Sequence, residues 1–401
     1  MNKANTRRLM SGYFLYESGR AMYFVLITWF LYQWTEDAFY TGLFVSFGFI
    51  PGLFSNIIFG VLVDRSNRKK LALLAGVISI ICLVLLIGTF WFEVEHPWLM
   101  IAAHMFMQTA GSLFRPSLQA LVAEVFPRDS LPRIFSWSGS STVAGSLTGA
   151  AVGGVLAGLA AIETSLTVVV LLYVGAAATI QMIRYTPVER NHSNDSLTFW
   201  DEMKEGFVYV HQNQMLYGLF VMLMLGQLTF HTTLGFLSVY TSSHLKQSAL
   251  VYGMLDSTFS IGGILAGLIG TWWWAKCQNR IGTWSLLLTA AGLAIVSFTN
   301  LVPVAFLGFL LIGLGTSFVR ALLQSVQQMA TDSRFHGRMS SLRMLCNQTS
   351  VVVTGPIFGV LASSHGAPAV FLCLLIPVTG GVLWAHIQSK RPAFKQITKP
   401  A

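Results

Sequence analysis

Glu17 and Arg20 stand three residues apart in an otherwise apolar stretch, so a helix places both side chains on one face. A carboxylate beside an arginine can form an ion pair, and it can also bind and release a proton. Asp256 is a second acid inside an apolar stretch. Desolvation favours the neutral form of a carboxyl group, which suits reversible protonation. Glu17 and, after it, Asp256 are therefore the candidates for proton coupling. Two alternatives stay open: Glu17 and Arg20 only neutralise each other, or Asp256 lies in water near an outer surface.

Further polar side chains recur every three or four residues along other apolar stretches, which aligns them on single helical faces. Such faces can line a polar cavity that binds a small molecule. The candidate cavity residues are Tyr13, Tyr16, Arg20, His104, Gln108, Arg115, Gln227, His231, Arg320 and Gln324. Arg115 and Arg320 have other interpretations, in which they extend to an aqueous interface or latch helices together.

The elements that carry these residues must be membrane-spanning helices. The chain is 54% hydrophobic and 10% charged, against roughly 25% charged residues in soluble domains. Apolar segments of about 20 residues, the length that crosses a bilayer, recur throughout. We expect an all-α membrane protein with twelve spans at 12–33, 40–63, 71–92, 98–124, 134–160, 164–184, 215–240, 249–275, 281–299, 303–329, 339–363 and 367–388.

The positions of the basic residues predict the topology. With a cytoplasmic N-terminus, twenty of the 25 Lys and Arg residues fall in cytoplasmic segments, Lys246 falls outside, and four arginines lie within spans. By the positive-inside rule, both termini are cytoplasmic. This topology explains the net charge of +9, because the basic residues then face the anionic lipid headgroups of the inner leaflet. No nucleic acid partner is therefore expected.

An internal repeat divides the chain. Gly111, Phe114 and Arg115 recur as Gly315, Phe318 and Arg320, at offsets of about 205 residues. We expect a six-helix bundle at 1–184, a cytoplasmic linker at 185–214, and a second bundle with a short cytoplasmic tail at 215–401. Repeats that place polar residues inside apolar helices are typical of secondary transporters, whose substrate sites lie where the repeats meet.

The loop between the second and third spans reads Gly60-x-Leu62-x-Asp64-Arg65-x-x-Arg68-Lys69. It resembles the signature loop of the major facilitator superfamily, and the two predicted bundles agree with that family's fold. The resemblance implies that Gly60, Asp64, Arg65 and Arg68 form a gating loop, in which Asp64 faces the start of the eleventh span near Arg338. The alternative for Arg68 is that it only follows the positive-inside rule.

A small-residue stripe, Gly145-x-x-x-Gly149-x-x-x-Gly153, resembles the antiporter motif of exporting members, although Ala150 stands where that motif has a proline. Helix packing explains the glycines equally well. The Arg115-Pro116 pair and the Leu131-Pro132-Arg133 turn resemble the bacterial branch that includes macrolide efflux pumps and the enterobactin exporter.

These resemblances imply proton-driven export of a small amphiphilic molecule across the bacterial inner membrane. The substrate alternatives are a hydrophobic drug, a siderophore, and a lysolipid or glycolipid that is exported or flipped. A non-transporting membrane sensor is the remaining alternative. We expect no enzyme activity, because the polar residues follow the repeat and form no recognisable nucleophile–base arrangement. We expect no metal, because the cysteines show no metal-ligand spacing, and no nucleotide cofactor, because the sequence contains no phosphate loop. The expected partners are protons, the substrate and lipids, and the protein is expected to be a monomer.

Overall fold

The computed structural model describes residues 3–184, 199–332 and 335–398, apart from the side chains of a few residues inside these ranges. Nearly all of these residues are helical, and the predicted all-α membrane fold is confirmed. The chain divides into two compact units. One comprises Met1–His192 with Gln247–Ser257, and the other comprises Ser193–Lys246 with Thr258–Ala401.

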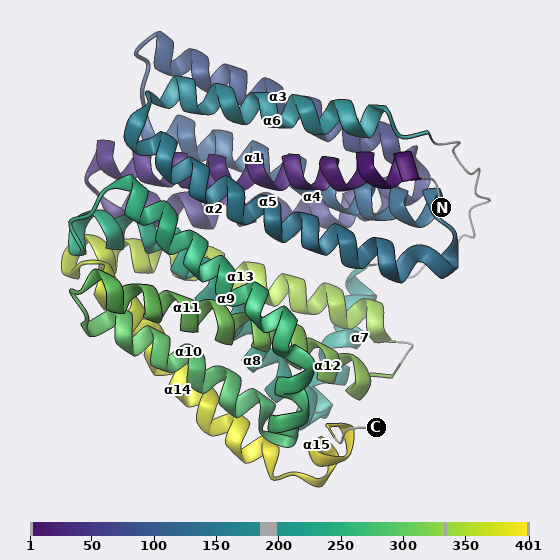
Figure 1. Cartoon of the computed structure of the whole chain (residues 1–401). Coiled ribbons are helices and arrows are strands. Elements are labelled where there is room, and N and C mark those ends of the chain that lie inside the picture. Colours follow the sequence, from purple (N-terminus) through teal and green to yellow (C-terminus); the bar gives the residue numbers. More distant parts are fainter. Residues whose placement is uncertain (1–2, 185–198, 333–334, 399–401) are drawn as a thin grey trace. The chain divides into compact units, whose positions relative to one another are not determined.

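The first unit contains six long helices and the first turns of a seventh. They are α1 (Lys3–Thr35), α2 (Ala38–Arg65), α3 (Arg68–Trp91), α4 (Pro97–Val125), α5 (Leu131–Leu159), α6 (Ile162–Gln181) and the start of α9 (Ala249–Cys277). Helix α1 packs along α5 and α6, while α4 packs against α2 and α3 (Figure 1). This arrangement brings α1 and α4, which carry the candidate acid and arginines, into one bundle.

The second unit contains the remaining helices. They are α7 (Phe199–Gln212), α8 (Gln214–Val239), most of α9, α10 (Ile281–Phe298), α11 (Val302–Phe318), α12 (Gln324–Ala330), α13 (His336–His365), α14 (Ala367–Ser389) and α15 (Pro392–Ile397). Helix α10 packs between α11 and α14, and α8 packs on α13 and α14. Helix α7 lies within the segment 185–214, which the sequence predicts to be a linker. It ends one residue before α8, whose N-cap Asn213 accepts a hydrogen bond from the Met215 amide.

Nine segments of the described chain are long and apolar enough to cross a membrane. One of them, Ala249–Phe298, holds two helices, α9 and α10. Among the described helices, α1 and α4 are long but do not meet the criterion. These two helices carry Glu17, Arg20, His104 and Arg115, which lower their mean hydropathy. The count of twelve spans stays a prediction.

The tenth span departs from the sequence prediction of one continuous helix over 303–329. Helix α11 gives way to a π-helical turn at Val319–Leu323 before α12 continues to Ala330. A second π-helical turn, Tyr240–His244, extends α8. Such turns insert a residue into the α-helical ladder and occur frequently at functional sites. Arg320 lies inside the first of them.

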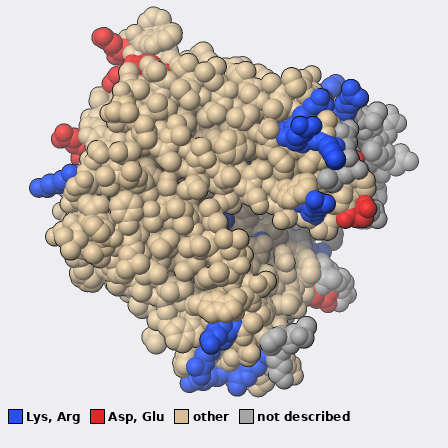
Figure 2. Space-filling view, viewed as in Figure 1, with Lys and Arg blue, Asp and Glu red and all other residues tan. Residues whose placement is uncertain are grey.

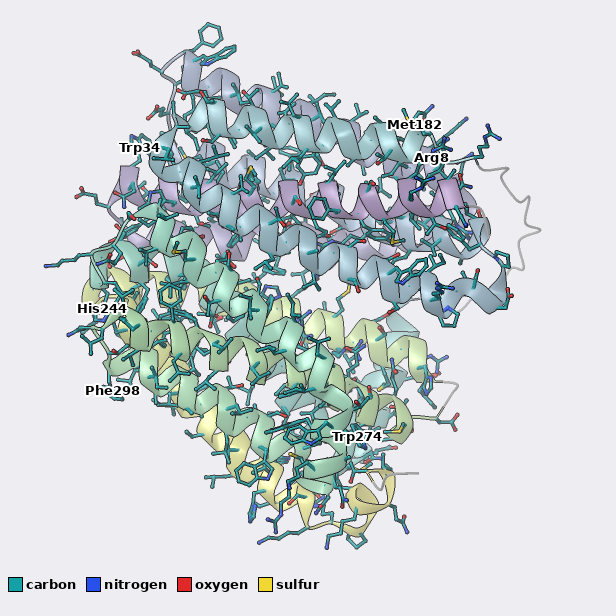
Figure 3. All side chains as sticks on the ribbon, in the orientation of Figure 1. Arg8, Trp34, Met182, His244, Trp274 and Phe298 are labelled. Carbon is teal, nitrogen blue, oxygen red and sulfur yellow. The ribbon has the colours of Figure 1, made fainter. Side chains whose placement is uncertain are left out.

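The outer surface of each unit suits a bilayer. In Figure 2, most of the visible surface carries neither acidic nor basic side chains. Large apolar side chains such as Leu85, Leu268 and Leu383 are exposed, as expected for residues that face lipid. Figure 3 shows Arg8 and Trp34 at opposite ends of α1, and Arg8 Nη1 donates to the Met182 carbonyl oxygen at 2.7 Å.

Candidate functional site

Glu17 is the centre of an ion-pair cluster in the first unit. Arg20 Nε donates to its Oε2 at 2.6 Å, and Arg115 of α4 donates from Nε to Oε1 at 3.2 Å and from Nη2 to Oε2 at 3.4 Å. The Glu17 side chain is 5% exposed, whereas those of Arg20 and Arg115 are 35% and 50% exposed. The sequence predicted the contact with Arg20 but not the one with Arg115, which lies 98 residues away.

Aromatic packing fixes the position of this cluster. The Tyr16 ring stacks on Phe114 with centroids 3.7 Å apart, and it meets the edge of Tyr173 from α6 at 5.1 Å. Tyr16 and Tyr13 are both buried. Because Phe114 and Arg115 are neighbours on α4, the stack on Tyr16 sets the height of Arg115 beside Glu17.

The glycine stripe of α5 lies directly on α1 at the level of this cluster. A Cβ atom at Gly145 would come within 2.5 Å of the Phe14 carbonyl oxygen, and one at Gly149 would collide with the Ser18 carbonyl oxygen. Gly149 therefore allows the two backbones to touch beside Glu17, as small residues do between membrane helices. The observed contacts support the packing interpretation of the stripe.

Asp256 lies on the part of α9 that belongs to the first unit. Its side chain is buried, and among the described residues its carboxylate has no hydrogen-bond or ion-pair partner. One turn earlier, the Tyr252 hydroxyl forms a 2.7 Å hydrogen bond with Thr28 of α1. Burial contradicts the alternative that Asp256 lies in water near an outer surface, so it remains a candidate proton site.

His104 lies deeper in the first unit than a substrate-contacting residue is expected to lie. It is 4% exposed and its ring stacks on Phe44 at 3.8 Å. A Cβ atom at Gly48 would collide with its Nε2, and its Nδ1 has no partner among the described residues. Gln108, one turn further along α4, is half-buried.

In the second unit, the π-helical turn presents Arg320 to an aromatic face. The Arg320 guanidinium carbon lies 4.4 Å from the centroid of the Phe230 ring on α8, a cation–π contact. Phe230 also packs edge-on against its neighbour His231. Gln227, His231 and Gln324 are half-buried. Arg320 and Arg115 are thus equivalent in the repeat but differ in their contacts, one with an aromatic ring and one with a carboxylate.

The proposed gating loop is described in part. Helix α2 ends at Arg65, and the Asn67 side chain caps α3 by accepting from the Lys70 amide. The environment of Gly60 and the side chains of Asp64 and Arg65 lie outside what the structure describes. Arg68 is buried and pairs with Glu124 of α4. From the sequence, Arg68 was expected to belong to the gating loop or, alternatively, only to follow the positive-inside rule. Glu124 is a partner that sequence reasoning missed, and its position in the last turn of α4 was the available signal.

Breaking the Arg68–Glu124 pair is expected to destabilise the first unit. Glu124→Gln leaves a buried guanidinium without its counter-charge, which typically costs about 3–5 kcal/mol. The double variant Arg68→Met/Glu124→Met removes both charges and should recover much of that loss. Thermal unfolding in detergent measures both. A Glu124→Gln protein as stable as the wild type would show that the pair contributes nothing to the fold.

The sequence was compared with family models and with known proteins. The model described as Major Facilitator Superfamily matches residues 9–243 and 219–400. Macrolide efflux protein A of Streptococcus pyogenes is 27% identical over 279 residues, which cover 66% of this chain and 64% of that protein. The chain thus spans less than two thirds of that relative. The multi-drug resistance efflux pump PmrA of Streptococcus pneumoniae is 26% identical over 369 residues, which cover 88% of this chain and 87% of the pump.

Solved structures show the same fold. The crystal structure of the nucleoside transporter NupG aligns over all of both chains with a TM-score of 0.73 and 16% identity. A bacterial homolog of the human lysosomal transporter Spinster, in an inward-facing and unoccupied conformation, aligns over 99% of this chain and 98% of its own with a TM-score of 0.71 and 13% identity. At these identities the likeness concerns the fold alone.

Proposed function

The chain belongs to the major facilitator superfamily, and from that premise we propose that it exports a small amphiphilic molecule by proton antiport with alternating access. It is then a multi-pass transporter of the bacterial inner membrane with two six-helix bundles and both termini in the cytoplasm. The names of its efflux relatives support export. The distribution of Lys and Arg supports the orientation, which reporter fusions after Gln396 and between residues 191 and 198 test.

The observation that carries the proposal is the buried Glu17 carboxylate held by two arginines from different helices. When Glu17 is ionised, it binds Arg115 of α4 to α1. When a proton neutralises Glu17, these charge-assisted hydrogen bonds weaken and Arg115 of α4 is no longer held by Glu17 of α1. Protonation therefore changes a contact between two helices of the first unit, which is what a transporter needs to couple proton binding to rearrangement. Asp256 is the second candidate for proton coupling.

The proposed substrate is a drug-like compound such as a macrolide, by analogy with the named relatives. A carboxylated compound such as a siderophore is the second candidate. One observation favours it: two arginines face one carboxylate, and both side chains retain exposed surface. In either case Arg20 and Arg115, together with Arg320, are the proposed substrate-binding cations, and Gln108, Gln227, His231 and Gln324 supply hydrogen bonds.

We also propose that Asp64 latches the cytoplasmic gate, as the family resemblance implies. Arg338, near which Asp64 is expected to lie, donates to Glu205 of α7 at 2.5 Å in this structure. Asp64→Asn should insert normally, because the loop lies at the aqueous surface, yet transport should slow because the closed gate loses a charged contact. Near-normal transport at equal expression would refute the latch.

The experiment that tests the function measures accumulation of candidate compounds in cells with and without the gene. A macrolide, a fluorescent cationic dye and a carboxylated siderophore represent the substrate classes. Collapsing the membrane potential and the pH gradient separately reports the driving force. Proton antiport predicts lower accumulation in expressing cells and loss of that difference when the pH gradient is removed. Equal accumulation of every compound in both strains would overturn the proposal.

A further inference from the structure

Arg343 is an arginine within α13 whose role the proposed function leaves open. It lies seven residues after the first residue of α13, or about 10 Å along the helix axis. Its Nη1 donates to Gln327 Oε1 of α12 at 2.8 Å, and its Nη2 lies 3.4 Å from the Ser340 hydroxyl. All three residues belong to the second unit.

Among the described residues, the groups that accept hydrogen bonds from Arg343 are neutral. Among the residues that the structure describes, no carboxylate pairs with its guanidinium. A charged side chain inside a membrane helix is costly unless it is paired. An arginine that merely extended to the cytoplasmic water would need no protein acceptor, yet Nη1 bonds to a glutamine that is 1% exposed.

The amide of Gln327 has a second group without a partner. Its Oε1 accepts from Arg343, while its Nε2 is buried and has no hydrogen-bond partner among the described residues. A buried donor without an acceptor is unfavourable, because it has lost its hydrogen bonds to water without replacing them. The Arg343 guanidinium and Gln327 Nε2 are thus neighbouring donors that are not fully hydrogen-bonded. A negatively charged acceptor would satisfy both.

The internal repeat does not conserve this pair. At the offset of 205 residues that relates Arg320 to Arg115, Gln327 corresponds to Val122, which is fully buried. At the offset of 206 that relates Gly355 to Gly149, Arg343 corresponds to Trp137. At the two corresponding positions the first half therefore has Val and Trp, whereas the second half has an amide and a cation.

We propose that Arg343 and Gln327 form a binding site for an anionic oxygen group, a carboxylate or a phosphate. The guanidinium supplies parallel N–H donors that match the two oxygens of such a group, and Gln327 Nε2 supplies one more. The group reaches the site from one of two sources. It is the phosphate of an anionic lipid in the cytoplasmic leaflet, or it is a soluble carboxylate that enters from the cytoplasm.

The test uses Gln327→Glu in the full-length purified chain. This substitution keeps the size of the side chain and supplies the missing carboxylate, so that the new acid would pair with Arg343 internally and exclude an external anion. In one arm, nanodiscs of phosphatidylcholine alone are titrated with citrate by calorimetry. In the other arm, native mass spectrometry counts phosphatidylglycerol molecules retained from nanodiscs that contain this lipid. The wild type should bind in one arm, and Gln327→Glu should bind at least about tenfold more weakly in that arm.

Two further variants complete the design. Arg391 also donates to a glutamine, Gln214, but at an exposed position, so Arg391→Gln is the matched control and should bind like the wild type. Arg343→Gln removes the cation without leaving a buried charge and should lose binding as Gln327→Glu does, which keeps the test valid if one variant folds poorly. Absence of wild-type binding in both arms, or equal binding by wild type, Gln327→Glu and Arg343→Gln, would overturn the site.

Discussion

Glu17→Gln is expected to abolish uphill export while leaving substrate binding measurable. The amide keeps the shape of the side chain and can accept from Arg20 and Arg115, but it cannot alternate between charge states. One proton moved through 100 mV supplies about 2.3 kcal/mol, enough for roughly a fifty-fold concentration ratio. Without that proton, the steady-state ratio of a transported compound across vesicles with an imposed pH gradient should fall to about one.

The control for this variant is Glu163→Gln, which makes the same chemical change at the start of α6, outside the ion-pair cluster. It should transport like the wild type. Downhill exchange of labelled compound shows whether the Glu17→Gln protein still binds and rearranges. Wild-type uphill transport by Glu17→Gln, with unchanged dependence on the pH gradient, would exclude this residue as the coupling site and transfer the role to Asp256.

Gly149→Leu is expected to prevent the first unit from packing. The new side chain would have to occupy the space of the α1 backbone, because even a Cβ atom at this position collides with the Ser18 carbonyl oxygen. Overpacking with side chains as neighbours typically costs about 1–3 kcal/mol, and a backbone neighbour yields less, so we expect more than about 3 kcal/mol here. Size-exclusion chromatography and thermal unfolding of the purified protein measure the loss.

Gly139→Leu is the matched control on the same helix. Nothing lies within 4 Å of a Cβ atom at Gly139, which is exposed. Leucine also has a higher helix propensity than glycine, so this variant should be at least as stable as the wild type. If Gly149→Leu and Gly139→Leu unfold at the same temperature, the contact between α5 and α1 is not the tight packing described above.

The family and the helices could be predicted from the sequence because their signals are local. Apolar length predicts a span, and the loop from Gly60 to Lys69 carries its motif in adjacent residues. The polar face of α1 also followed from spacing, so the contact between Glu17 and Arg20 was predicted. The interruption at Val319–Leu323 was not, since nothing in that apolar segment distinguishes a π-helical turn from a continuous α-helix.

The sequence by itself determined an all-helical membrane protein with an internal repeat and polar residues on defined helical faces. Only the tertiary structure decided which of these residues meet. Arg115 pairs with Glu17 while its repeat mate Arg320 lies over Phe230, and Arg68 pairs with Glu124. The physical reason is that each partner comes from a different helix. Which partners meet therefore depends on how closely the helices pack and on their relative height. The glycines of α5, for example, allow a close approach to α1. No short-range sequence pattern encodes such distances.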